Sequence, residues 1–163
     1  MNSEKVHLGC GKVRRKGYDN VDPYSGSSGV IKMCAVKYMK QRKYDSIDIV
    51  KTFHMIEHLP REPGKKLLYF IGKCLKPGGR LILECPNVRM EMQRFLRGES
   101  GGGPIWGQQK YPGDYHQWGY TPEYLQELLE SFGMEITHMG PGTDRHAREG
   151  GPEYQIRCEA VKP

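Results

Sequence analysis

The sequence lacks the features of a membrane or exported protein. No run approaches the roughly 18 consecutive apolar residues that a membrane helix needs. The first seven residues, Met1 to His7, contain no apolar stretch of the kind found in signal peptides. The five cysteines are scattered and form no C-x-x-C pair. Because an odd, dispersed set of cysteines is typical of reduced thiols, we expect a cytoplasmic protein without membrane contacts.

The length and composition favour one globular domain with an uneven charge. The chain has 163 residues, of which 37% are hydrophobic, so residues 1–163 can bury one sizeable core. Residues 1–66 carry a balance of +7 and the remaining residues a balance of −1. A basic segment can attract nucleic acid or an anionic substrate. No cluster reaches five basic residues, however, so an ordinary solvated surface is the simpler interpretation.

The order of expected elements predicts an α/β fold with a mostly parallel sheet. An amphipathic helix fits Pro63 to Leu75, where apolar residues recur at helical spacing and Pro77-Gly78-Gly79 follows. Strands alternating with helices favour parallel pairing. The expected strands before and after this helix are residues 6–8, 19–21, 30–33, 46–50 and 80–85.

The C-terminal third is expected to close this sheet. Thr121-Pro122-Glu123 suits a helix N-terminus, and Gly133 suits the position after the helix ends. Two strands, at 134–139 and 154–161, surround a turn at 140–152, and strands without an intervening helix pair antiparallel. Before that helix, residues 98–120 form a long segment rich first in glycine and then in aromatics. We expect it to be a lid or substrate loop.

Two features near the N-terminus indicate a nucleotide-like ligand. Leu8-Gly9-Cys10-Gly11 follows directly on a strand, and glycines there allow the backbone to approach a ligand closely. Asp22 ends the second expected strand, where an acidic residue can hold both hydroxyls of a ribose. Taken alone, Asp22 is better explained as a turn residue before Pro23.

Five segments in a fixed order give the sequence a family resemblance. They are Leu8-Gly9-Cys10-Gly11, Gly17-Tyr18-Asp19-Asn20-Val21-Asp22, Tyr44-Asp45-Ser46-Ile47-Asp48, Ile56-Glu57-His58-Leu59 and Leu75-Lys76-Pro77-Gly78-Gly79-Arg80-Leu81. This series resembles the class I S-adenosylmethionine-dependent methyltransferases, and especially their compact type 11-like group. The resemblance implies a Rossmann-like fold and S-adenosylmethionine as cofactor. It also implies methyl transfer to an oxygen or nitrogen atom of a small molecule or sugar.

The resemblance also implies roles by position. The expected contacts are Gly9, Cys10 and Gly11 at the methionine end of the cofactor, Asp22 at the ribose, Cys34 and Ala35 beside the adenine, and Thr52, Phe53 and His54 near the sulfonium. The sequence departs from the family at His7 and Cys34, where acidic residues are usual. Only ten residues separate Gly11 from Asp22, so the first crossover helix must be short or missing.

Two histidine-containing segments could carry further chemistry. His54-Met55-Ile56-Glu57-His58 matches the H-x-x-E-H zinc-peptidase pattern, but Pro60 would end the required helix. No later helix offers a third ligand, so we expect no metal and assign Glu57 and His58 to bracing a turn. A second cluster could form an acceptor wall or simply pin the loop, and it consists of Tyr111, Tyr115, His116, Trp118 and Tyr120. His54 and His116 are the candidate catalytic bases, because imidazole titrates near neutral pH.

Two other functions compete with small-molecule methylation. A nucleic-acid methyltransferase would suit the basic N-terminal segment, but Lys51-Thr52-Phe53-His54 replaces the expected Asn/Asp-Pro-Pro-aromatic signature. A non-catalytic S-adenosylmethionine-binding protein would suit the departures at His7 and Cys34. The methyl acceptor and the oligomeric state stay open.

Overall fold

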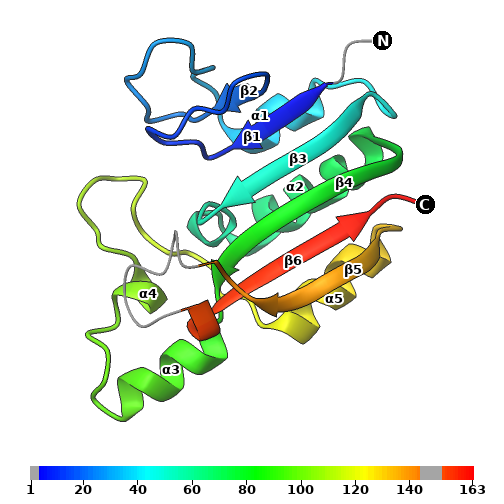
Figure 1. Cartoon of the computed structure of the whole chain (residues 1–163). Coiled ribbons are helices and arrows are strands. Elements are labelled where there is room, and N and C mark those ends of the chain that lie inside the picture. Colours follow the sequence, from blue (N-terminus) through cyan, green and yellow to red (C-terminus); the bar gives the residue numbers. More distant parts are fainter. Residues whose placement is uncertain (1–3, 144–151) are drawn as a thin grey trace.

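Six strands form one mixed sheet in the order β2-β1-β3-β4-β6-β5 (Figure 1). The computed structural model describes residues 4–143 and 152–163. Neighbouring strands among β1 to β4 pair in parallel, whereas β6 pairs antiparallel with both β4 and β5. The predicted α/β sheet with antiparallel C-terminal strands is therefore confirmed. The strands are β1 (Lys5–Leu8), β2 (Asp19–Val21), β3 (Ile47–Phe53), β4 (Leu75–Pro86), β5 (Glu135–Pro141) and β6 (Gln155–Val161).

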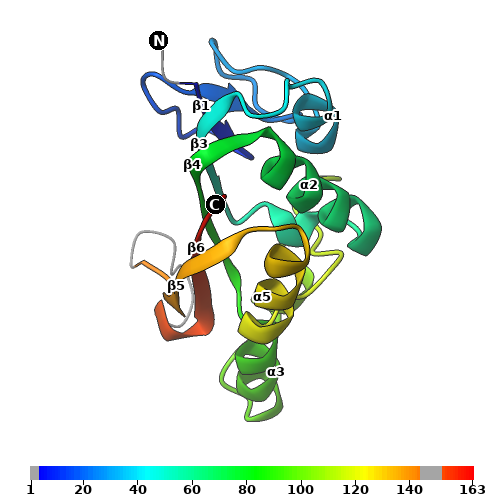
Figure 2. The ribbon, with the colours of Figure 1, turned by 90° about the vertical axis from the view of Figure 1, so that its right-hand side faces the viewer.

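Three helices, α1, α2 and α5, cover the same face of this sheet (Figure 2). Thr121 caps α5 as predicted, because its hydroxyl accepts a hydrogen bond from Tyr124 N at 3.3 Å. Within the described ranges, no helix combines the length and apolarity needed to cross a membrane. The helices are α1 (Ala35–Lys40), α2 (Arg61–Cys74), α3 (Val88–Leu96), α4 (Gly103–Trp106) and α5 (Pro122–Ser131), with short 3-10 turns η1 (Ile56–His58) and η2 (Pro152–Tyr154).

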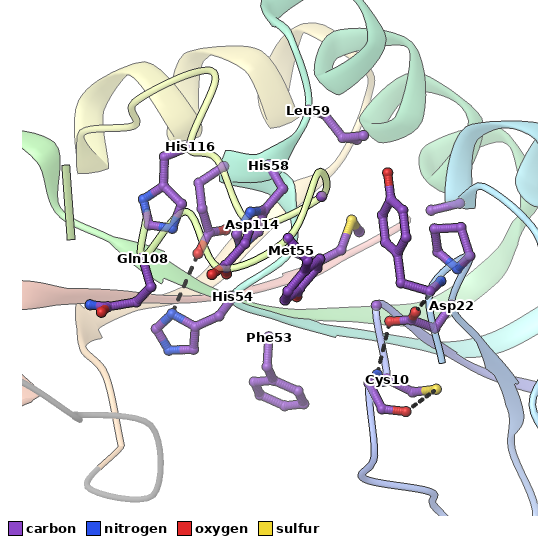
Figure 3. A pocket seen from close by; sticks show the side chains of 18 of the residues that line it. Cys10, Asp22, Phe53, His54, Met55, His58, Leu59, Gln108, Asp114 and His116 are labelled. Carbon is purple, nitrogen blue, oxygen red and sulfur yellow. Dashed lines mark hydrogen bonds and ion pairs between the residues drawn. The ribbon is translucent and has the colours of Figure 1, made fainter. Parts of the chain in front are cut away.

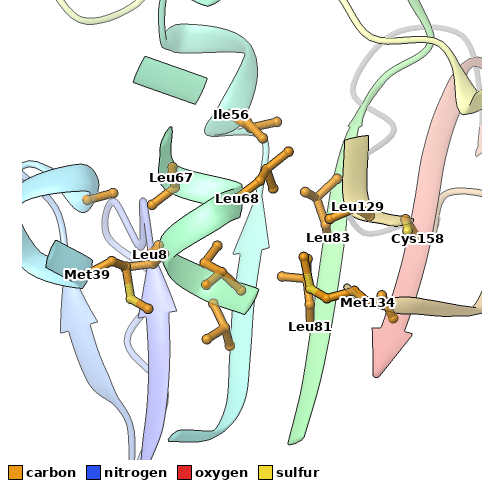
Figure 4. Close-up of a cluster of buried hydrophobic side chains, with 14 of the residues drawn as sticks. Leu8, Met39, Ile56, Leu67, Leu68, Leu81, Leu83, Leu129, Met134 and Cys158 are labelled. Carbon is orange, nitrogen blue, oxygen red and sulfur yellow. The ribbon is translucent and has the colours of Figure 1, made fainter. Parts of the chain in front are cut away.

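The core lies between the sheet and these helices (Figure 4). Leu67 and Leu68 of α2 are fully buried, as their helical spacing predicts. Leu81 and Leu83 of β4 meet them from the sheet, because alternate strand residues point to the same face. This burial holds the strand ends in fixed positions, which matters for the site described below.

On the opposite face of the sheet, a buried ion pair links β4 and β6. Glu84 of β4 is 1% exposed, and its carboxylate accepts a hydrogen bond from Arg157 Nη1 of β6 at 2.7 Å. The hydroxyl of Thr143 lies 3.2 Å from the same carboxylate, and Arg157 also pairs with Glu159. Because buried charges require partners, this pair fixes β6 against β4 on the face that α1, α2 and α5 leave uncovered.

Two predicted strands differ from the structure. The strand expected at 30–33 is a single bridge between Ile31 and Val21, because the chain turns into α1 at Cys34. The strand expected at 80–85 begins earlier, at Leu75, which pairs with Ile47. Helices α1 and α3 were not foreseen from the sequence. The turn expected at 140–152 lies partly outside the described residues. Residues 9–18, all of them described, contain no helix, which confirms the missing first crossover.

The buried pair on the uncovered face predicts a specific loss of stability. Replacing Arg157→Met leaves Glu84 buried without its main cation, and we expect a loss of about 2–4 kcal/mol in the free energy of unfolding. Arg89→Met is the matched control, because it breaks an ion pair with Glu123 in which both side chains are more than half exposed. That control should cost less than about 1 kcal/mol. Urea denaturation measures both, and equal losses would contradict the assignment.

Candidate active site

A cavity of about 760 Å³ opens at the carboxyl ends of β1, β2 and β3. Ligands bind at this edge in open parallel sheets, because the connecting loops diverge there. Figure 3 shows Cys10 and Asp22 at one end of the cavity and His54, His116 and Gln108 at the other. The cavity therefore has two chemically different ends, which are described in turn.

The loop after β1 forms one wall of the first end. Gly9 has a φ of +65°, and a Cβ atom at this position would overlap the side chain of Met55. Only glycine fits both conditions without strain. The amides of Gly9 and Cys10 donate to the carbonyl of Val21 at 2.8 and 3.2 Å, which fastens the loop to β2. Burial and the nearby Asp22 raise the pKa of the Cys10 thiol to about 11, so it stays protonated.

Asp22 organises this end of the cavity. Its Oδ2 atom accepts a hydrogen bond from Gly11 N at 2.9 Å. Its Oδ1 atom accepts from the amides of Tyr24 and Ser25, both at 2.8 Å. A carboxylate offers about four acceptor positions, so one on Oδ2 is left for a ligand hydroxyl. Asp22 thus holds the glycine loop and faces the cavity at the same time.

The structure gathers all but one of the predicted cofactor residues around this cavity. Thr52 is the exception, because it is 1% exposed and does not line the cavity. Strand alternation turns Thr52 toward the covered face, whereas Phe53 points the other way. The predicted residues that line the cavity are Gly9, Cys10, Gly11, Asp22, Cys34, Ala35, Phe53 and His54.

At the second end, the chain leaves β3 through a strained turn. His54 has a φ of +49°, a left-handed conformation that is uncommon for residues other than glycine. Its amide donates to the carbonyl of Glu84 at 2.9 Å, which ties the turn to β4. Its Nδ1 atom forms an ion pair with Glu57 Oε1 at 3.4 Å. Residues 56–58 form a 3-10 turn, so His54 and His58 do not share an α-helical face.

Glu57 is the most deeply buried charged group of the site. It is 2% exposed, and within the described residues neither carboxylate oxygen has a hydrogen-bond partner. Burial favours its neutral form. The contact with His54 and the electrostatic influence of the neighbouring His54, His58 and His116 outweigh this effect and lower the pKa of Glu57. The site therefore concentrates one carboxylate among three imidazoles.

The predicted substrate loop packs against Glu57 through backbone hydrogen bonds. The amides of Gln117 and Trp118 both donate to the carbonyl of Glu57, at 2.7 and 3.2 Å. The side chain of Gln117 donates to the carbonyl of His58 at 2.8 Å. These bonds bring His116 into the cavity, with its ring 4.6 Å from that of His58. Burial lowers the pKa of His116, which favours the neutral imidazole.

The expected aromatic acceptor wall forms only in part, because Tyr111 lines the cavity but Tyr115 and Trp118 do not. Tyr115 is 47% exposed and does not line the cavity. Trp118 packs against the core, with the guanidinium of Arg61 5.2 Å from its ring centre. Polar side chains of Gln108, Asp114 and Gln117 line this end instead. The sequence analysis missed them, and it also gave Glu57 and His58 only a bracing role, because their approach to His116 depends on tertiary folding.

Comparisons with known proteins agree on the type of domain. A family model described as a methyltransferase domain matches residues 8–139. A search of curated proteins found no match.

Solved structures share the fold at low sequence identity. A methyltransferase from Archaeoglobus fulgidus is 19% identical with a TM-score of 0.65, over 98% of this chain and 86% of that chain. A methyltransferase from Methanosarcina mazei is 17% identical with a TM-score of 0.67. The match covers 99% of this chain and 93% of that chain. A third structure is the 1,6-didemethyltoxoflavin-N1-methyltransferase of Burkholderia thailandensis with bound S-adenosylhomocysteine. It is 14% identical with a TM-score of 0.66, and the match covers 99% of this chain and 72% of that chain. With a family match over most of its length and the fold to go with it, the chain belongs to the class I methyltransferases that use S-adenosylmethionine as methyl donor.

Proposed function

We propose that this methyltransferase methylates an oxygen or nitrogen atom of a small polar molecule, with a sugar-like hydroxyl as the best fit. The observation that carries the proposal is the shared cavity. One end presents the glycine loop and Asp22, and the other presents imidazoles and amide side chains (Figure 3). A cavity of about 760 Å³ lies within the usual range for small-molecule sites.

We assign the donor to the end of the cavity that contains Asp22. The backbone of Gly9, Cys10 and Gly11 would wrap the methionine part, because only glycine permits such close approach. The remaining acceptor position of Asp22 would bind a ribose hydroxyl. Cys34 and Ala35 would flank the adenine. Phe53 would then lie near the sulfonium, with His54 beside it toward the opposite end of the cavity.

We assign the acceptor to the opposite end, beneath residues 98–120. Gln108, Asp114 and Gln117 supply both hydrogen-bond donors and acceptors there. Such side chains suit a polar acceptor better than a flat apolar ring, since they can exchange hydrogen bonds with a polar ligand. The loop would also exclude water from the methyl group when both ligands are bound.

The chemistry requires alignment and, for a hydroxyl, removal of a proton. The acceptor lone pair forms a bond to the methyl carbon while the carbon–sulfur bond breaks. The electron pair of that bond stays on sulfur, which becomes the neutral thioether of S-adenosylhomocysteine. The hydroxyl proton passes to an imidazole and then to water. His54 and His116 are the two histidines proposed for this step.

Calorimetry and an acceptor screen test the proposal. We expect S-adenosylmethionine and S-adenosylhomocysteine each to bind one site per chain. Methyl transfer from labelled donor is then measured to a panel of sugars, other small alcohols, amines and a short RNA. Transfer to a small hydroxyl or amine supports the proposal. Transfer to RNA alone, or donor binding without transfer to any of them, would overturn it.

Asp22→Ala tests the donor assignment. We expect the affinity for S-adenosylhomocysteine to fall by about 1–3 kcal/mol, because a buried hydroxyl loses its acceptor and the glycine loop loses its anchor. Asp114→Ala is the control, since it removes another carboxylate that lines the same cavity. Calorimetry on folded variants measures both. An unchanged affinity in Asp22→Ala would remove Asp22 from the donor site.

His116→Ala tests the acceptor assignment. We expect turnover to fall at least about 100-fold, the lower range for a lost acid–base group, with donor affinity nearly unchanged. Tyr115→Ala changes the adjacent residue, whose side chain lies outside the cavity, and should leave turnover intact. Steady-state kinetics and calorimetry separate the two effects. Equal losses in both variants would indicate a general disturbance of the loop.

A further inference from the structure

Three side chains at the acceptor end meet in the pattern of a metal site. One potential ligand atom from each of Glu57, His58 and His116 lies within 4.8 Å of the other two. Glu57 and His58 come from η1, whereas His116 comes from the loop that folds over it. All three line the cavity, so an ion between them would face the acceptor.

The hydrogen bonds of the two histidines fix which nitrogen is available. His58 Nδ1 lies 3.1 Å from the carbonyl of Tyr115, and His116 Nδ1 lies 2.9 Å from the carbonyl of Pro104. A carbonyl can only accept, so both Nδ1 atoms must carry a proton. Nε2 is therefore the only nitrogen of each ring that can bind an ion. A backbone carbonyl behind the far nitrogen is the usual support of a metal-binding histidine.

Glu57 supplies the third and charged group. Its carboxylate is 2% exposed, and within the described part of the chain neither oxygen accepts a hydrogen bond. Its ion pair with His54, at 3.4 Å, involves only Oε1. Buried carboxylates are normally paired, hydrogen-bonded or bound to a metal, because their desolvation is costly. The pair with His54 leaves Oε2 free to bind an ion.

We propose that Glu57, His58 and His116 bind one divalent transition-metal ion. Two imidazoles and one carboxylate suit zinc, iron or manganese and leave coordination positions open. Bonds of about 2.1 Å place neighbouring ligand atoms roughly 3.4 Å apart, so modest side-chain rotation closes the site. This set differs from the linear H-x-x-E-H pattern, because His54 orients the carboxylate and the loop provides the third ligand.

The open positions give the ion a role toward the acceptor, and this role rests on the proposed function. An acceptor hydroxyl bound to the ion would lose its proton more readily, since a bound cation lowers the pKa of a coordinated oxygen. With the Nε2 atom of His116 held by the metal, the proton would pass to His54. Binding of the ion itself requires none of this, so it can be tested separately.

Metal titration of the full chain tests the site directly. The probes are ZnCl2 and MnCl2, added separately to metal-free protein in calorimetry. Manganese is included because it has little affinity for thiols, and the chain has five free cysteines. We expect one equivalent of at least one ion to bind. His58→Ala, His116→Ala and Glu57→Gln should each weaken it at least about 100-fold, since loss of outer supporting groups alone can reach that scale. His138→Ala is the control, because that histidine is exposed on β5.

Titration of S-adenosylhomocysteine into the same samples separates this proposal from the preceding one. Stoichiometric metal binding that the three site variants lose and His138→Ala retains supports the metal site, whether or not the donor binds. Absence of binding for both ions in folded protein that binds S-adenosylhomocysteine would overturn it. Binding that survives in His58→Ala and His116→Ala would also overturn it, and these two variants decide the matter if Glu57→Gln does not fold.

Discussion

The register of β3 between β1 and β4 is the constraint on which the site depends. Leu8 pairs with Thr52, and Phe53 pairs with Glu84, so the three strands end side by side. The glycine loop and the His54 turn must then leave the sheet at the same edge. Apolar packing on the covered face and the Glu84–Arg157 pair on the other face both hold this register. A slip of one residue would exchange the two faces of β3 and disperse the cavity.

Burial of Glu57 beneath a loop is costly, and the surrounding structure offsets that cost. The loop residues Gln117 and Trp118 bind the backbone carbonyl of Glu57, while three histidines surround its side chain. The loop is therefore bound to η1 by main-chain hydrogen bonds that do not depend on side-chain identity. The same bonds close the end of the cavity beside Glu57, so the polarity of that end and the order of the loop are physically linked.

At the other end of the cavity, the carboxylate of Asp22 holds most of the local structure in place. A short ten-residue connection replaces the first crossover helix, and the carboxylate of Asp22 fastens it by accepting the amide of Gly11. The same carboxylate fixes the following turn through Tyr24 and Ser25. One side chain therefore replaces much of the order that a helix would impose. This explains how a chain with so short a connection can keep a defined pocket after β1 and β2.

The sequence by itself determined the parallel sheet, the glycine loop after β1, and the capped helix α5. Each of these follows from residues close together in the chain, such as Thr121 before Pro122 or Gly9 directly after a strand. Only the tertiary structure decided that Thr52 faces the core and that Trp118 packs away from the cavity. It also decided that His116 meets Glu57 and His58. His58 and Gln117 are 59 residues apart, and their contact arises from loop packing that no local periodicity encodes.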